Sequence, residues 1–456
     1  MKQTETFTQG PIFGPLVRFS VPILLAQFLQ ALYGAVDLLI VGQFGGELAE
    51  VWVSGVSTGS QIMQTLTIVI TGVAMGLTVC VGERIGAGRP EEAGKLIGSG
   101  IFFFGSLALA VTAAMLLLAP TLTRLMQAPK EAFDATVTYT LICSAGTVFI
   151  VAYNLLGSIF RGLGDSKLPL LAVVIACVLN IAGDLLLVAV FHMGAAGAAI
   201  ATIFAQAVSV LLSLLVIRRR KLPFSFSLRD IRPNRRHVRQ ILKLGVPIAL
   251  QDLLVGLSFL VIIAIVNRLG LIESAGVGIA EKACIFLMLV PSAFMQSMSA
   301  FVAQNIGARK PERAKRSLLL GILTSLSLGV VMGWFTFFHG DLLAGIFARD
   351  REIILPAADY LKAYAFDCVL TSFLFCFIGY FNGCGNTAFV MLQGIAGAVG
   401  VRLPVSLLMS RRVPVSLFRI GLATPISSAV QILLCVGYYA FTSRRNTGIT
   451  ADGYLQ

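Results

Sequence analysis

Charged residues are scarce in this chain. Only 12% of its 456 residues are Asp, Glu, Lys or Arg, whereas about 25% is usual in soluble proteins. A soluble chain of this length would form two or three domains, each with a charged surface. These charges are too few for that, and 57% of the residues are hydrophobic. The composition therefore indicates that lipid is the solvent.

Other absences exclude whole classes of function. The eight cysteines are scattered, without a CxxC pair or interleaved histidines, which argues against a zinc or iron–sulfur site. The three histidines, His192, His237 and His339, lie at or beyond the ends of apolar runs, so an intramembrane enzyme is disfavoured. The basic residues behind the net charge of +13 lie in short loops, which excludes a nucleic-acid-binding domain. The N-terminus has no basic region followed by an apolar core, so we expect no cleaved signal peptide.

What the chain has is apolar runs of the length that spans a bilayer, about 20 residues. Helices are expected, because an open strand in lipid leaves backbone groups unpaired. The fold class is thus an all-α polytopic membrane protein with twelve transmembrane helices, predicted near 15–41, 52–80, 96–118, 136–158, 168–191, 195–217, 241–267, 277–302, 317–338, 357–381, 388–409 and 417–441.

The positions of Lys and Arg predict the orientation. The even-numbered connections carry nineteen of them and the odd-numbered connections carry seven. Both termini are therefore expected on the cytoplasmic side of the inner membrane, with a cytoplasmic tail at 442–456. The Arg-rich stretch within 218–240 could contact lipid head groups or nucleic acid, but a cytoplasmic linker explains it more simply.

The two halves of the sequence repeat one another. Residues 85–95, IGAGRPEEAGK, align with 306–316, IGARKPERAKR, and residues 159–166 align with 380–387 at the same offset of 221. The pattern around Pro22 recurs around Pro247. Six helices per half predict parallel lobes, 1–217 and 241–441, related by a pseudo-two-fold axis along the membrane normal. Two such lobes favour alternating access.

Ionisable side chains inside spans need an explanation, because each costs at least about 2.5–3.5 kcal/mol by insertion scales. Asn180 lies one helical turn before Asp184, so the two share a face. On the next predicted helix, the residues at 198, 202 and 206 form a similar stripe. We interpret Asp37 and Asp184 as functional, whereas Asn154, Thr202 and Gln206, taken singly, also fit hydrogen bonds between helices.

The second lobe differs at these positions. The repeat partners of Asp37 and Asp184 are Ile262 and Val405, which places the carboxyl chemistry in the first lobe. Asp367, with Tyr364 one turn before it, is an open case. Asp252 and Glu281 are expected to have structural or interfacial roles.

At these residues the sequence resembles the multidrug and toxic compound extrusion (MATE) family. The resemblance rests on Val21-Pro22 followed by Val36-Asp37, on the IGAGRPEEAGK loop, on RGLGDSKLP at 161–169, and on NIAGD followed by GAAGAAIAT at 194–202. It implies a two-lobe, cation-coupled antiporter that exports amphipathic, often cationic compounds. The cation site that it implies comprises Asp37, Asn180, Asp184 and Thr202, with the backbone carbonyl of Ala198.

One departure from the family pattern argues against a cation site in the second lobe. Some members carry a glutamate where Val255 stands here, so a cation site in the second lobe is disfavoured and the role of Asp367 is doubtful. Asn154, Gln206, Tyr364 and Asp367 remain candidates for lining the substrate cleft. The coupling ion is either H⁺ or Na⁺, the latter bound at Asp37, Asn180, Asp184 and Thr202, and no other cofactor is expected.

The expected partners are a small amphipathic or cationic molecule and the lipid bilayer, with the protein acting as a monomer. The alternative is a flippase for lipids or lipid-linked oligosaccharides from the same superfamily.

Overall fold

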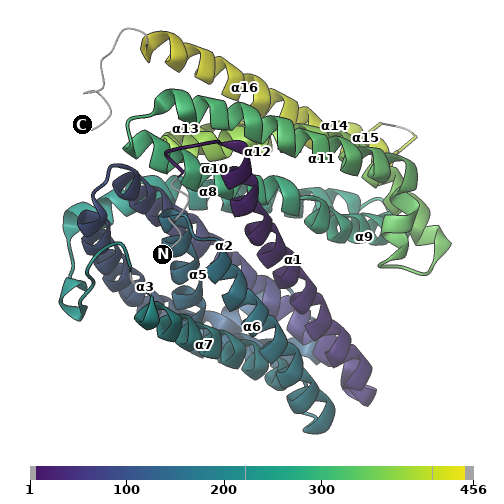
Figure 1. The fold of residues 1–456 in the computed structure, drawn as a ribbon. Coiled ribbons are helices and arrows are strands. Elements are labelled where there is room, and N and C mark those ends of the chain that lie inside the picture. Colours follow the sequence, from purple (N-terminus) through teal and green to yellow (C-terminus); the bar gives the residue numbers. More distant parts are fainter. Residues whose placement is uncertain (1–6, 221, 413, 447–456) are drawn as a thin grey trace. The chain divides into compact units, whose positions relative to one another are not determined.

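The computed structural model describes residues 7–220, 222–412 and 414–446, with side chains up to residue 443. These residues form helices joined by short turns, and no strand occurs in the described ranges (Figure 1). The predicted cytoplasmic tail, 442–456, lies outside them from residue 447 onward, as does Lys221 of the predicted linker.

All twelve predicted spans fall on long helices. Eleven are long and apolar enough to cross a membrane, and the bent pair α4–α5, with 56° between its members, makes the twelfth. The spans are α1 (Phe13–Phe44), α2 (Ala49–Gly86), α3 (Pro90–Leu125), α4 (Phe133–Ala145) with α5 (Thr147–Leu163), α6 (Lys167–Asp184) with the π-helix η3 (Leu185–Val190), α7 (Gly194–Arg219), α8 (Arg235–Val266), α9 (Leu271–Leu287) with α10 (Leu289–Gly307), α11 (Pro311–Gly345), α12 (Arg351–Gly383), α13 (Thr387–Ile395) with the π-helix η5 (Ala396–Arg402) and α14 (Leu403–Ser410), and α15 (Leu417–Gly421) with α16 (Ala423–Asn446). Three single 3₁₀ turns, η1 (Gly46–Leu48), η2 (Lys130–Ala132) and η4 (Leu228–Asp230), lie between them.

Several helices extend beyond the apolar runs that predicted them. Helix α3 begins at Pro90 rather than near residue 96, and α11 begins at Pro311 rather than near 317. Proline suits the first helical position, where its missing N–H is not needed. Glu91 and Glu92 then lie in the first turn of α3, where a negative charge is favourable. An apolar run marks only the part of a helix inside the hydrocarbon.

The predicted repeat is confirmed in the backbone of the turns. Gly164 and Gly385, 221 residues apart, both have left-handed φ angles, +82° and +78°. The next residue in each turn, Asp165 or Asn386, donates its backbone N–H to a carbonyl five residues earlier, at 2.9 and 2.8 Å. This closes the end of α5 and of α12 in the same way. Glycine is needed here because other residues rarely adopt this conformation.

Contacts divide the chain into two compact units. One comprises Val21–Ala249, and the other comprises the described parts of Met1–Ser20 and Leu250–Gln456. Helices α1 and α8 each begin in one unit and continue into the other, and Pro22 and Pro247 lie close to the two crossing points. The predicted domain limits, which follow the order of spans, stay a prediction.

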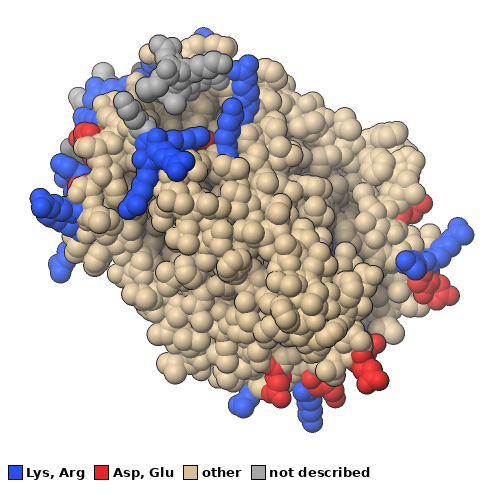
Figure 2. All heavy atoms as spheres, turned by 60° about the horizontal axis from the view of Figure 1, so that its bottom comes forward, with Lys and Arg blue, Asp and Glu red and all other residues tan. Residues whose placement is uncertain are grey.

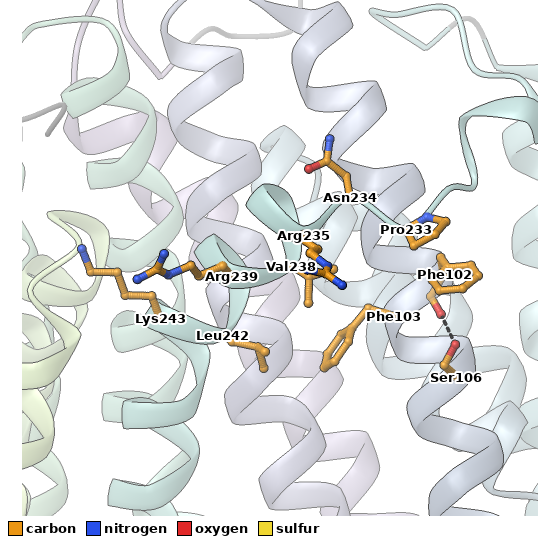
Figure 3. Close-up of a pocket in the computed structure, with 10 residues that line it drawn as sticks. All are labelled: Phe102, Phe103, Ser106, Pro233, Asn234, Arg235, Val238, Arg239, Leu242 and Lys243. Atoms are coloured by element: carbon orange, nitrogen blue, oxygen red, sulfur yellow. Dashed lines mark hydrogen bonds between the residues drawn. The ribbon is translucent and has the colours of Figure 1, made fainter.

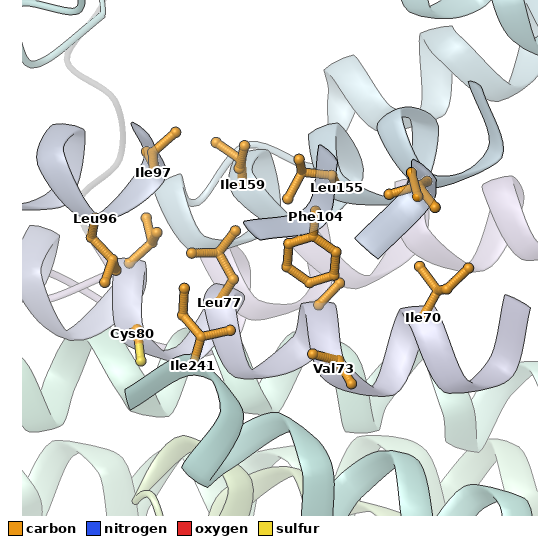
Figure 4. Close-up of a cluster of buried hydrophobic side chains, with 14 of the residues drawn as sticks. Ile70, Val73, Leu77, Cys80, Leu96, Ile97, Phe104, Leu155, Ile159 and Ile241 are labelled. Atoms are coloured by element: carbon orange, nitrogen blue, oxygen red, sulfur yellow. The ribbon is translucent and has the colours of Figure 1, made fainter. Parts of the chain in front are cut away.

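The core of the Val21–Ala249 unit joins α2, α3 and α5 to the beginning of α8 (Figure 4). Leu77, Phe104, Ile159 and Ile241 are buried in it. Helices α2 and α8 cross with backbones almost in contact, because a Cβ atom at Gly76 would lie 2.5 Å from the carbonyl oxygen of Ile241. Small residues at such crossings are how membrane helices pack closely.

In the other unit, the residues before α1 contact the end of α10 and the first turn of α11. The ring of Phe7 contacts those of Phe19 and Phe301, with centroids 4.9 and 4.8 Å apart. The Arg313 guanidinium donates to the carbonyl oxygens of Phe7 at 2.8 Å and Gly10 at 2.6 Å. A second core cluster in this unit contains buried residues of α8, α9, α11, α12 and α15.

The surface is that of a protein solvated by lipid. Figure 2 shows a broad face without charged side chains, with Lys, Arg, Asp and Glu gathered at its margins. Large apolar side chains are exposed along the helices, as at Leu109 (66%) and Leu117 (80%) of α3. In water such exposure would be costly, whereas in lipid it is expected.

Candidate functional site

The polar cluster predicted from the sequence is built by α1, α6 and α7 within the Val21–Ala249 unit. Asp184 is the last residue of α6, directly before the π-helical turn η3, and Asn180 lies one turn earlier. Turns of π-helix are rare and often occur at functional sites, because they break the regular backbone pairing. The two side chains therefore project from a locally irregular part of the span.

Close packing of α7 against α6 brings the second stripe to this face. A Cβ atom at Gly183 would lie 2.9 Å from the Cβ of Ala201, closer than side chains normally approach. The Thr202 hydroxyl donates to the carbonyl oxygen of Ala198 at 3.0 Å. The Asn180 amide donates to the Thr202 hydroxyl at 3.3 Å. Glycine at 183 thus permits the approach that joins the two helices through hydrogen bonds.

Helix α1 adds the second carboxyl group. Asp37 lies close to the side chains of Asp184, Asn180 and Thr202. Asp184 is fully buried, and Asp37, Asn180 and Ala198 are each no more than 5% exposed. The structure therefore brings together all five residues that the sequence analysis predicted as a cation site.

The donors in this cluster are too few for its acceptors. Both carboxylate oxygens of Asp184, Oδ1 of Asp37 and Oδ1 of Asn180 are buried without a hydrogen-bond donor among the described residues. Two ionised carboxylates at this range repel each other strongly, and a buried charge without a partner is costly. A proton or a cation shared by these oxygens would remove both penalties.

The walls around the carboxyl pair are apolar and aromatic. Ile40, Val41 and Val188 are buried next to it in one cluster. Tyr33, one turn before Asp37 on α1, lies beside both Asp37 and Gln206. Sequence analysis missed Tyr33, although its spacing of four residues from Asp37 placed the two on one face. Gln206 is thus connected to the cluster through Tyr33.

Asn154 has a different environment. Its amide nitrogen donates to the carbonyl oxygen of Ile150 at 2.8 Å, and its Oδ1 accepts a hydrogen bond from the Thr71 hydroxyl at 3.3 Å. It therefore bridges α5 and α2, which is the packing role that the sequence analysis left open.

The remaining candidates, Tyr364 and Asp367, lie in the other unit. The Ser428 hydroxyl donates to Oδ1 of Asp367 at 2.6 Å, and Tyr360 and Tyr364 donate to Oε1 of Glu281 at 3.1 and 3.4 Å. Each of these carboxylates accepts a hydroxyl hydrogen bond, whereas neither carboxylate oxygen of Asp184 has a donor among the described residues.

Arg402 at the end of η5 was missed by the sequence analysis. Its Nη1 donates to the Ser258 hydroxyl at 3.0 Å, and its guanidinium lies 4.4 Å from the centre of the Phe259 ring. Its Nε is buried without a hydrogen-bond acceptor among the described residues. An arginine inside an apolar run was the available signal.

Comparison with known proteins identifies a matching family model and similar relatives. A family model described as MatE matches residues 22–186 and 247–408. The probable multidrug resistance protein YoeA of Bacillus subtilis is 24% identical over 97% of this chain and 96% of its own length. The multidrug export protein MepA of Staphylococcus saprophyticus is 25% identical over 90% of each chain.

Solved structures agree on the fold. One is a transporter of the MOP superfamily from Pyrococcus furiosus, described as having a binding pocket of reverse polarity that suggests a different function. It superposes with a TM-score of 0.90 at 21% identity over 97% of this chain and 98% of its own. A MATE structure in complex with MaL6 gives a TM-score of 0.89 at 21% identity over 98% and 99%. Because the MatE model matches more than half of the chain, in two segments that correspond to its internal repeat, the chain belongs to the MatE, or multidrug and toxic compound extrusion, family.

Proposed function

We propose that the protein is an efflux transporter that exchanges a small amphipathic, often cationic compound for H⁺ or Na⁺ by alternating access. The observation that carries this proposal is a set of four buried oxygens on Asp37, Asn180 and Asp184 that have no donor among the residues that the structure describes. Such a set is costly unless a positive charge binds it. The relative MepA is named a multidrug export protein, and the relative YoeA is named a probable multidrug resistance protein. Drug export is what a cation-exchange site in a two-lobe transporter can drive.

The mechanism follows from charge balance. When Asp37 and Asp184 have bound the coupling cation, their net charge falls and a cationic substrate loses the counter-charge that held it. When the cation leaves, the carboxylates attract substrate again. Each ligand favours the state it binds more tightly, so the two ligands alternate. No chemical conversion of the substrate is required.

The coupling ion determines what drives the cycle. One charge moving through 100 mV yields about 2.3 kcal/mol, which is roughly a fifty-fold gradient. Exchange of one proton for one monovalent cation moves no net charge, so such a cycle runs on the proton gradient alone. We favour the proton, because Val255 replaces the second-lobe glutamate of other family members. The oxygens of Asn180, Ala198 and Thr202 are available as additional ligands for Na⁺.

The substrate side of the proposal is broader. We assign Gln206 and Tyr33 to the neighbourhood of the exchange site, and we keep Tyr364 and Asp367 as candidates for contacting substrate from the second lobe. The excess of Lys and Arg in the even-numbered connections supports a protein in the cytoplasmic membrane with both termini inside the cell. We propose a monomer as the working unit.

A flippase is the second candidate, and one observation favours it. Arg402 is a buried cation in the second half of the chain, and guanidinium groups bind phosphates well. The acidic cluster of the first half would not bind the phosphate of an anionic lipid, so we place the flippase second.

Transport into sealed vesicles separates these functions. Purified protein in proteoliposomes should move a fluorescent quaternary amine when a pH or Na⁺ gradient is imposed, and Asp37→Asn should abolish that movement. The matched control is Asp134→Asn, which removes an exposed carboxylate in the same unit. Movement of a labelled anionic lipid without any dependence on the gradient would instead support the flippase.

A further inference from the structure

A hollow of about 620 Å³ lies between α3 and the beginning of α8, away from the carboxyl cluster (Figure 3). It lies entirely within the Val21–Ala249 unit, and its volume is in the range of small-molecule sites, about 300–1,000 Å³. The α3–α8 pocket is lined by Phe102, Phe103, Ser106, Pro233, Asn234, Arg235, Val238, Arg239, Leu242 and Lys243.

One wall of the pocket carries three basic side chains, although most of the pocket surface is apolar. Asn234 fixes the first turn of α8, because its Oδ1 accepts the backbone N–H groups of Arg236 and His237 at 3.0 and 3.3 Å. Arg235, Arg239 and Lys243 then follow at intervals of four residues and lie on one face. Like charges at this spacing destabilise a helix, so an anion between them would be stabilising.

Among the described residues, no carboxylate supplies such an anion to Arg235 or Arg239. Asp165 pairs with Arg220 at 2.6 Å, and Glu92 lies 3.7 Å from Arg89. Glu91 accepts hydrogen bonds from Ser225, and Asp230 caps the turn at Ser227. Arg235 and Arg239 make no side-chain hydrogen bond or ion pair with the residues that the structure describes, and both are exposed.

The opposite wall is apolar. In Figure 3, Phe103 and Leu242 lie below Arg235 and Val238, while Phe102 lies beside Pro233. Phe102 is 41% exposed. An inorganic anion or a nucleic acid would use the basic wall and leave these rings uncovered, whereas an amphiphile with an anionic head would cover both walls.

The depth of the pocket fits the head-group layer. Helix α3 has 36 residues, so it is about 54 Å long and exceeds the roughly 30 Å hydrocarbon core. Phe102 lies about 18 Å from its beginning, and Arg235–Lys243 precede the apolar part of α8. Aromatic rings and long basic side chains are both favoured at this level of a bilayer.

We propose that the α3–α8 pocket binds an anionic phospholipid, with its phosphate on Arg235, Arg239 and Lys243 and the upper part of an acyl chain against Phe102, Phe103 and Leu242. This site is independent of the carboxyl cluster and of the transported compound. The proposal thus assigns a lipid head group to the basic linker, where the sequence analysis preferred a plain cytoplasmic connection.

Binding of fluorescent short-chain phosphatidylglycerol to the full-length protein in neutral detergent tests this proposal. The variant Arg235→Gln/Arg239→Gln/Lys243→Gln should bind it roughly a hundredfold more weakly, since each basic residue near a lipid phosphate contributes about fivefold, or about 1 kcal/mol. The matched control, Arg219→Gln/Arg229→Gln/Arg232→Gln, removes the same charge from exposed positions outside the pocket and should change binding less than threefold. Phe102→Ser should weaken lipid binding with the basic wall intact.

Four outcomes would overturn the site. Equal losses in the two triple variants would show that the linker attracts anions diffusely. Competition by inorganic phosphate at the same concentration as the lipid would show an anion site without a role for the acyl chain. Displacement by a short RNA at that concentration would show a nucleic-acid surface. Binding of phosphatidylcholine as tight as that of phosphatidylglycerol would show that the charge plays no part.

Discussion

Asp184→Asn is the sharpest test of the proposed exchange site, because the structure predicts opposite effects on stability and on transport. Both carboxylate oxygens of Asp184 and Oδ1 of Asp37 are buried without a donor in the described part of the chain. Asparagine keeps the shape of the side chain and supplies an N–H group that can donate a hydrogen bond to Asp37. A buried polar group without a partner costs about 1–3 kcal/mol. In Na⁺-free alkaline buffer the variant should therefore be about 1–3 kcal/mol more stable than the natural protein, while gradient-driven efflux is lost.

The coupling ion should also stabilise the natural protein and not the variant. A ligand that binds only the folded state contributes about 2.7 kcal/mol at a concentration one hundred times its Kd, and about 1.4 kcal/mol for each further factor of ten. Thermal unfolding of the purified protein, followed across Na⁺ concentration at fixed pH and across pH without Na⁺, measures this dependence. It should be absent in Asp184→Asn and intact in Asp134→Asn.

Two results would refute the reasoning. Efflux at the natural rate by Asp184→Asn would show that this carboxyl group is not needed for coupling. A variant whose stability still responds to the ion as the natural protein does would show that the ion binds elsewhere.

Three further predictions follow from the same geometry. Asp367→Asn should reduce efflux by much less than Asp184→Asn does, because Asp367 already accepts a hydroxyl hydrogen bond; equal losses in a vesicle assay would reveal a second coupling site. Thr202→Val should raise the Na⁺ concentration for half-maximal transport if Na⁺ is the coupling ion, whereas with proton coupling it should shift the pH profile of transport and leave it independent of Na⁺. Gly183→Val should reduce efflux at least tenfold, because the valine side chain would separate α6 from α7 at Ala201. The control Gly256→Ala should not reduce efflux, because there is open space around Gly256. Normal efflux by the valine variant would show that this close approach is unnecessary.

Hydropathy was sufficient for the spans and insufficient for their irregularities. Each predicted span coincides with one helix or with consecutive helical segments, because only a helix satisfies its own backbone in lipid. The bend near Gly146 and the π-helical turns η3 and η5 left no signal in the apolar pattern. Hydropathy reports where a segment lies and not how its backbone hydrogen bonds are shifted.

The site shows a similar division. Asn180 and Asp184 could be placed on one face from their spacing alone, and the structure brings Asp37 and Thr202 to the same place. That approach depends on close helix packing at Gly183, which spacing within one helix does not encode. Arg402 was visible in the sequence, but its cation–π contact with Phe259 is a tertiary feature.

Helices α1 and α8 each begin in one unit and continue into the other, and this has a consequence for biosynthesis. Residues 7–20 are translated long before the rest of their unit, which is otherwise built from Leu250 onward. The hydrogen bond between Phe7 and Arg313 spans 306 positions of the chain. The segment that begins at Phe7 must therefore wait, without its final contacts, until most of the protein has left the ribosome. The Val21–Ala249 unit likewise needs the beginning of α8. A gene divided at the basic linker would then encode two polypeptides that each lack a piece of their own core, and each polypeptide would carry the piece that the other needs.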